Sequence, residues 1–280
     1  MFMRIAVTSS ILALTGLAAP VLAADLDEII LAPELPMTQP VEVGSGWYLR
    51  GDLGYSVDRS GGATSYSIFS AGPPASYTAT PFTSAMLDGD WSGSLGVGYH
   101  FTDYFRGDLT FDYAKGDFTG TTTSATPCAG GAPGTSCAST DTQGFKQYGL
   151  MANAYLDLGT FAGFTPYVGA GAGMTRVNWG PLNSDQRCVP GGGACGAAPA
   201  DIVSAGSESW RFTYALMAGM SYDIAKDWKL DVGYKYSKIR KGDQFGFDPA
   251  SITAGAQGAR AGDNGFENHE IRVGLRYSLW

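Results

Sequence analysis

From residue 46 onward, apolar residues stand at every second position in one segment of the chain after another. A period of two places apolar and polar side chains on opposite faces of a β-strand. In the first such segment the apolar residues are Trp47, Leu49, Leu53, Tyr55 and Val57. The pattern recurs seven times and predicts eight strands, near residues 47–57, 90–101, 104–117, 146–159, 164–179, 209–224, 227–239 and 267–280.

The fifth predicted strand is rich in Gly and Ala, so its faces must be assigned from its few large side chains. We expect Tyr167, Val177 and Trp179 to point outward. This choice turns the polar side chains of Arg176 and Asn178 inward, as the other strands turn theirs.

The connections between these strands alternate strictly between short and long. The long connections, rich in Gly, Pro, Ser and Thr, lie near 58–89, 118–145, 180–208 and 240–266. Outer-membrane barrels combine short periplasmic turns with long outer loops, whereas a soluble Greek-key sandwich has no reason to alternate in this way. The sequence therefore predicts an all-β fold, an eight-stranded antiparallel transmembrane β-barrel with short periplasmic turns and four long extracellular loops.

Aromatic residues stand near both ends of the predicted strands. This distribution is typical of two aromatic girdles at the membrane interfaces, whereas the core of a soluble sandwich would concentrate aromatic residues in mid-strand. The tryptophans that we expect at the interfaces are Trp47, Trp91, Trp179, Trp210 and Trp228.

The first residues have the pattern of a secretory signal peptide. Arg4 precedes an apolar run that ends in the short residues before and at Ala23, where a signal peptidase would cut. The prolines and acidic residues that follow predict an extended linker. We therefore divide the chain into a signal peptide (1–23), an acidic periplasmic linker (24–45) and a barrel (46–280), and expect export through the periplasm to a Gram-negative outer membrane.

On the predicted strands other than the Gly- and Ala-rich fifth, the inward positions carry equal numbers of acidic and basic residues. The interior of an eight-stranded barrel is just wide enough for side chains to fill it, and an unpaired buried charge costs several kcal/mol. We therefore expect a self-neutralising charge network in the lumen, with a narrow ion path as the alternative. The bases are Arg50, Arg106, Arg211, Lys229, Lys235, Arg272 and Arg276, and the acids are Asp52, Asp108, Asp112, Asp157, Asp223, Asp231 and Glu270.

Two of the long loops each contain two cysteines. Cys128 and Cys137 share one loop, and Cys188 and Cys195 share another. Local pairing is the natural arrangement in an oxidising compartment, and neither loop contains a histidine that could complete a metal site. We predict two local disulfides and no metal.

The sequence contains two histidines, His100 and His269, and these are its candidates for acid–base catalysis. Barrel enzymes that act on lipid A combine a histidine with a hydroxyl and an acid. His100 falls at the periplasmic end of its strand, and His269 lacks an obvious Ser or Asp partner. We expect no catalytic residue and no cofactor, and a net charge of −8 without basic runs argues against nucleic acid as a partner.

Five segments stand out in order along the chain: GWYLRGDLGYSV, GYHFTDYFRGDLTFDY, TPYVGAGAGM, DWKLDVGYKYSKI and EIRVGLRYSLW. Together they resemble the OmpA-like barrel superfamily, and most closely the small surface-antigen, porin-like outer-membrane proteins of rhizobial and related bacteria. The resemblance covers residues 46–280 and implies a role in envelope integrity and surface exposure. The terminal Trp280 resembles the signal read by the barrel-assembly machinery, although it falls out of phase with Tyr277.

These observations favour a structural function, namely an integral outer-membrane barrel that supports envelope integrity and presents its loops as an adhesin or antigen would. A low-conductance, porin-like channel for small solutes is the alternative, and a lipid-modifying enzyme is a third hypothesis. The expected partners are outer-membrane lipid and lipopolysaccharide, the barrel-assembly machinery, and an unknown surface ligand of the loops.

Overall fold

The computed structural model describes residues 46–89, 91–125, 127–128 and 131–279. The predicted signal peptide, the predicted linker and Trp280 therefore lie outside the described residues. Within the described ranges, no helix has the length and the apolar character needed to cross a membrane.

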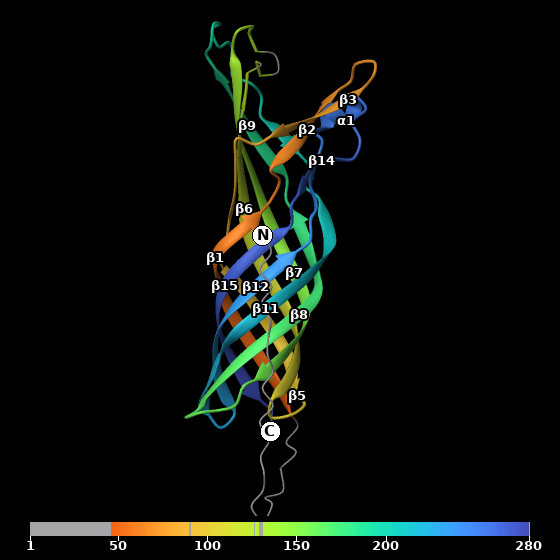
Figure 1. The fold of residues 1–280 in the computed structure, drawn as a ribbon. Helices are drawn as coiled ribbons and strands as arrows, with labels where there is room; N and C mark the ends of the chain where they lie inside the picture. The colour runs from red at the N-terminus through yellow and green to blue at the C-terminus, as the bar shows by residue number, and fades with distance from the viewer. Residues whose placement is uncertain (1–45, 90, 126, 129–130, 280) are drawn as a thin grey trace, which may run out of the picture. The chain divides into compact units, whose positions relative to one another are not determined.

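Eight long antiparallel strands pair in one closed ring (Figure 1). Each strand hydrogen-bonds to the next, and the last pairs with the first. A closed ring has no free edge, so its backbone groups are satisfied where they would otherwise face lipid. The predicted eight-stranded antiparallel barrel is confirmed. Its strands are β1 (Trp47–Gly61), β5 (Trp91–His100), β6 (Phe105–Ser124), β7 (Ser136–Asp157), β8 (Phe164–Trp179), β11 (Glu208–Ala225), β12 (Trp228–Ile239) and β15 (Phe266–Ser278).

The three short connections are present where the sequence placed them. They comprise residues 101–104, 158–163 and 226–227. In the turn between β7 and β8, Gly159 and Gly163 have φ angles of 99° and 82°. Only glycine adopts such angles at little energetic cost, so these two residues allow the chain to reverse tightly.

The four long connections contain folded elements, which the sequence pattern did not reveal. β6 and β7 continue as a paired hairpin to Ser124 and Cys137, so the predicted strand ends at residues 117 and 146 were too short. In this extension both faces of the hairpin carry polar residues, and the alternation that marks a half-buried strand is lost. The remaining loop elements are β2 (Ser65–Ser70), β3 (Ser76–Pro81), β4 (Ser84–Asp88), β9 (Leu182–Val189), β10 (Ile202–Ser204), β13 (Gly242–Gly246), α1 (Pro249–Thr253) and β14 (Ala259–Asp263).

The face assignment predicted for β8 was wrong. Tyr167, Val177 and Trp179 point into the barrel and are at most 7% exposed, whereas the Arg176 side chain faces outward. Side chains of directly paired residues share a face of the sheet, and Val177 pairs with the inward Gln147 of β7. A strand built largely of Gly and Ala carries little hydrophobic pattern of its own, so the register of its neighbours decides which side chains turn inward.

Candidate functional site

The lumen contains a network in which every one of the predicted charged residues forms an ion pair. The pairs draw on strands all around the barrel wall. Most of these side chains are buried, although the Asp223–Lys229 pair at the short-turn end of the barrel remains partly exposed. The pairs are Arg50–Asp52, Arg50–Asp108, Arg106–Asp157, Arg211–Asp263, Lys229–Asp223, Lys235–Asp112, Arg272–Asp112, Arg272–Glu270 and Arg276–Asp231.

Arg50 is the centre of the lower part of this network. Its guanidinium donates two hydrogen bonds to Asp52, at 3.0 and 2.8 Å. Its Nη1 atom donates to Asp108 at 2.7 Å and to the hydroxyl of Tyr155 at 2.8 Å. The planar guanidinium therefore joins β1, β6 and β7 across the lumen, an arrangement that the forked geometry of arginine favours.

Asp112 is the centre of the upper part. It accepts hydrogen bonds from Lys235 at 3.2 Å and from Arg272 at 3.0 Å, and Arg272 also donates to Glu270 at 3.1 Å. A cavity of about 40 Å³ lies beside Asp112, and another of about 20 Å³ lies beside Arg50. Each has room for only one to a few water molecules, so side chains fill these parts of the lumen.

The sequence pattern did not reveal the partner of Arg211. Its guanidinium binds Asp263 of β14, with an Nη1–Oδ2 distance of 2.6 Å, and both side chains are almost fully buried. Asp263 also accepts a hydrogen bond from the indole nitrogen of Trp179 at 3.1 Å. Asp263 belongs to the fourth long connection, where Gly-rich sequence gives no period from which an inward position could be assigned.

An apolar layer lies above the charges, at the loop end of the barrel. Rings from three strands meet there: Trp179 lies 5.0 Å from Phe145 and 5.6 Å from Phe266 between centroids. Loop residues complete the layer. Its members come from distant segments of the chain, so no local sequence pattern predicts it. They are Ala63, Phe118, Phe145, Val177, Trp179, Leu182, Ile239, Phe245, Ala261 and Phe266.

The predicted interfacial tryptophans divide into two groups. Trp47, Trp91, Trp210 and Trp228 are between 45% and 66% exposed on the outer face, as expected of aromatic girdles. Trp179 is 3% exposed and lies in the apolar layer, so its assignment to the interface was wrong. The inverted faces of β8 account for this error.

The two histidines lie on opposite faces of the wall. His100 packs on the ring of Tyr48, with centroids 5.0 Å apart. His269 hydrogen-bonds to the hydroxyl of Tyr234 and lies 5.1 Å from the ring of Tyr236. Both imidazoles are thus engaged with aromatic residues.

Both predicted disulfides are present. Cys128 is bonded to Cys137 and Cys188 to Cys195, with Cα–Cα distances of 4.7 and 5.9 Å. Cys137 and Cys188 are also direct partners in the pairing of β7 with β9. The two bridges therefore brace neighbouring strands at the tip of the β6–β7 hairpin.

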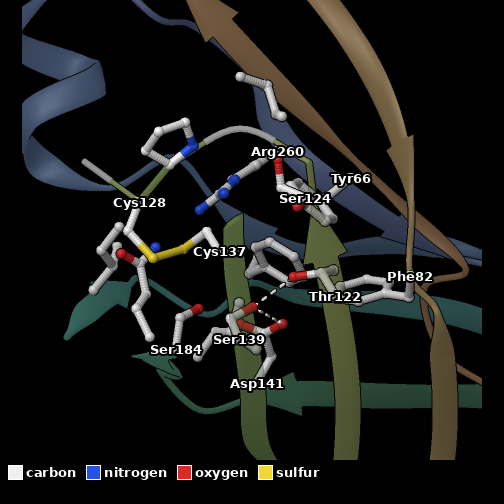
Figure 2. A pocket seen from close by; sticks show the side chains of 16 residues that line it. Tyr66, Phe82, Thr122, Ser124, Cys128, Cys137, Ser139, Asp141, Ser184 and Arg260 are labelled. Carbon is white, nitrogen blue, oxygen red and sulfur yellow. Dashed lines mark hydrogen bonds between the residues drawn. A yellow bond between two sulfur atoms is a disulfide. The ribbon is translucent and has the colours of Figure 1, made fainter. Parts of the chain in front are cut away.

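Side chains from all four long connections meet around a pocket of about 280 Å³ (Figure 2). On its floor, the Thr122 and Ser139 hydroxyls are hydrogen-bonded at 2.6 Å, and Ser139 donates to Asp141 at 3.1 Å. Burial raises the pKa of the Asp141 carboxyl, an effect that the hydroxyl donors oppose. At the opposite side, the Arg260 guanidinium lies over the Tyr66 ring at 4.9 Å.

Arg260 keeps unused hydrogen-bonding capacity within this pocket. Its Nη1 atom donates a long hydrogen bond of 3.4 Å to Ser204. Its Nε atom is buried and has no hydrogen-bond partner among the described residues. The pocket thus combines apolar and aromatic side chains with hydroxyl groups, one acid and one arginine, the mixed lining that is typical of ligand sites.

The chain matches the family of the outer membrane protein beta-barrel domain over residues 9–278. It belongs to this family. The protein is therefore an outer-membrane β-barrel, and its periplasmic turns and extracellular loops are those assigned above.

Individual relatives of this family member come from several bacteria. An uncharacterized protein of Brucella suis biovar 1 is 34% identical over 280 residues, covering 94% of this chain and 95% of that one. An adhesin-named protein of Rickettsia canadensis is 26% identical over 191 residues, covering 67% of this chain and 74% of that one. Among solved structures, Neisserial surface protein A matches with a TM-score of 0.44 and 17% identity, covering 85% of this chain and 99% of that one.

Proposed function

We propose that this outer-membrane barrel is a non-conducting scaffold that supports the envelope and holds a folded binding platform at the cell surface, as an adhesin does. The observation that carries the proposal is the filled lumen. Paired charges occupy the barrel interior, and the apolar layer lies across its loop end. An ion would have to displace buried ion pairs and then cross closely packed rings, and both steps are costly.

The folded loops support the second half of the proposal. If the long loops served only to link the barrel strands, they would not need β-strands, disulfides or a shared pocket of their own. Here two disulfides brace the hairpin tip, and the backbone amide of Ala63 donates to Gln244, which in turn donates to Gln143 at 3.0 Å. These contacts join three loops into one platform, and pre-organised surfaces of this kind bind with a smaller entropy cost.

The adhesin-named relatives from Rickettsia favour a surface ligand over a transported solute. The proposal therefore assigns ligand binding to the platform and no catalytic step to the barrel. Outer-membrane lipid, lipopolysaccharide and the barrel-assembly machinery complete the set of proposed partners.

Two measurements on the purified protein test this function. In planar lipid bilayers the wild type should give no channel events, and reconstituted in nanodiscs it should bind members of an array of glycans and matrix proteins. Arg260→Gln should weaken that binding, whereas Arg187→Gln, an exposed residue of β9 that does not line the pocket, should not. Regular single-channel currents without array binding would instead establish the low-conductance channel.

A further inference from the structure

A groove of about 740 Å³ crosses the outer face of the β6–β7 hairpin at the upper end of the barrel wall. Below this level β6 pairs with β5 and β7 pairs with β8. Above it, the same two strands pair with β4 and β9. Both edges of the hairpin change partners at the same height, and this change opens the groove. Its lining includes Trp91, Lys115, Lys146, Tyr148 and Asn178.

Two lysines face each other in this groove. Lys115 of β6 and Lys146 of β7 are direct partners in the antiparallel register. The Cβ atoms of such partners are about 5 Å apart on one face of the sheet, and like charges placed there repel each other. Both lysines are exposed. A bound anion would turn this repulsion into a shared attraction.

Two other cations on the outer surface are paired with acidic side chains of the chain itself. Arg176 forms a 2.7 Å ion pair with Glu208, and Lys238 forms a 2.6 Å ion pair with Glu267. Within the part of the chain that the structure describes, Lys115 and Lys146 form no ion pair with any acidic side chain. As far as the described residues are concerned, both ammonium groups can therefore bind a partner outside the chain.

The position of the pair identifies that partner. Each lysine stands two residues further out along its strand than a tyrosine of the outer aromatic girdle, Tyr113 on β6 and Tyr148 on β7, whose rings are 5.4 Å apart. A strand rises about 3.3 Å per residue, so with its tilt the ammonium groups lie roughly 5 Å beyond the girdle. This is the level of lipid headgroups.

We propose that Lys115 and Lys146 bind an anionic group of lipopolysaccharide, a phosphate or a sugar carboxylate, against the outer wall of the barrel. The pair faces away from the lumen, so it meets the outer leaflet and not the loop ligand. Lysine binds phosphate well as a compact point charge. This site deepens the lipopolysaccharide partnership proposed for the barrel and rests on it. It is separate from the pocket above, and its occupation does not depend on ligand binding by the platform.

An acidic residue at the outer edge of the groove gives the proposal a second, opposite test. Asp117 lines the groove two residues beyond Lys115, and it pairs in register with Asp88 of β4. Its negative charge repels a bound anion. Removing this charge should therefore strengthen binding, whereas removing the lysine charges should weaken it.

Native mass spectrometry of the full barrel in detergent with EDTA can measure how much lipid it retains. The probes are bis-phosphorylated lipid A, the same lipid A after dephosphorylation, and rough lipopolysaccharide that carries inner-core carboxylates. The variants are Lys115→Gln/Lys146→Gln and Asp117→Asn. The matched control is Lys226→Gln/Lys241→Gln, which removes two exposed lysines from a periplasmic turn and from a loop.

The wild type should retain the anionic probes, and Lys115→Gln/Lys146→Gln should weaken retention about 30-fold, since each surface lysine contributes roughly a factor of five or six to binding anionic lipid. The control should retain lipid as the wild type does, and Asp117→Asn should retain more. If the lysines increase retention of bis-phosphorylated lipid A over dephosphorylated lipid A, the bound group is a phosphate. If they increase retention only of the rough lipopolysaccharide, the bound group is an inner-core carboxylate. Equal retention by wild type and Lys115→Gln/Lys146→Gln on every probe, or weaker retention by Asp117→Asn, overturns the proposal.

Discussion

Asp108→Ala should destabilise the barrel by about 3 kcal/mol, within the range for removing one partner of a buried ion pair. The Asp108 carboxylate is fully buried and accepts three hydrogen bonds. The donors are Arg50 at 2.7 Å, Asn153 at 2.8 Å and Tyr48 at 3.1 Å. Alanine leaves all three donors without this acceptor, in a part of the lumen that has little room for replacement water.

Arg50 limits the size of the loss. It keeps both of its hydrogen bonds to Asp52, so its charge is not left wholly unpaired. This is why we expect the lower end of the range of 3–5 kcal/mol. Asp223→Ala is the matched control, because it removes the same group from the same network at the rim. There the Asp223 and Lys229 side chains are 38% and 28% exposed, and the loss should stay below about 1 kcal/mol.

Urea unfolding of the refolded protein in lipid vesicles, followed by tryptophan fluorescence and by heat-modifiable migration on gels, measures both variants. Planar-bilayer recording of the same samples should show no channel events in the wild type. If Asp108→Ala were no less stable than Asp223→Ala and ion selectivity changed, the lumen would be a wet pore, and the inference of a packed charge network would be refuted.

Two further predictions concern the loop end of the barrel. In variants that keep a single tryptophan, brominated lipids should quench the fluorescence of Trp91 and Trp210 on the outer face but not that of Trp179. Equal quenching of all three would contradict the inward position of Trp179. Trp179→Ala should lower the free energy of unfolding by about 3–5 kcal/mol through the cavity it leaves in the apolar layer. The raised pKa of Asp141 means that the folded platform binds this proton more tightly than the unfolded chain does. The ionised carboxyl therefore destabilises the folded platform at pH values above the folded-state pKa. This loss of stability disappears as the pH falls toward the ordinary aspartate pKa of about 3.9. Protease resistance of the loops should accordingly rise with acidification, and Asp141→Asn should be more resistant at neutral pH and lose this dependence.

The sequence by itself determined the barrel, because a strand with one face toward lipid and the other toward the lumen must alternate in polarity. The same alternation identified the inward charges, and the narrow lumen of eight strands required them to pair. The local disulfides followed from two cysteine pairs with short spacings. Each of these inferences depends on residues close together in the chain or on a rule that applies to every strand.

Only the tertiary structure decided the features that depend on contacts between distant segments. β8 has little hydrophobic pattern, so pairing with β7 and β11 set its faces and placed Trp179 inside. The partner of Arg211 came from a Gly-rich loop that folds back over the barrel end. The opposed lysines 115 and 146 became neighbours through the register of a hairpin whose length the sequence underestimated. Above the membrane no apolar solvent selects one face of a strand, and the order of the loops arises from their packing against one another.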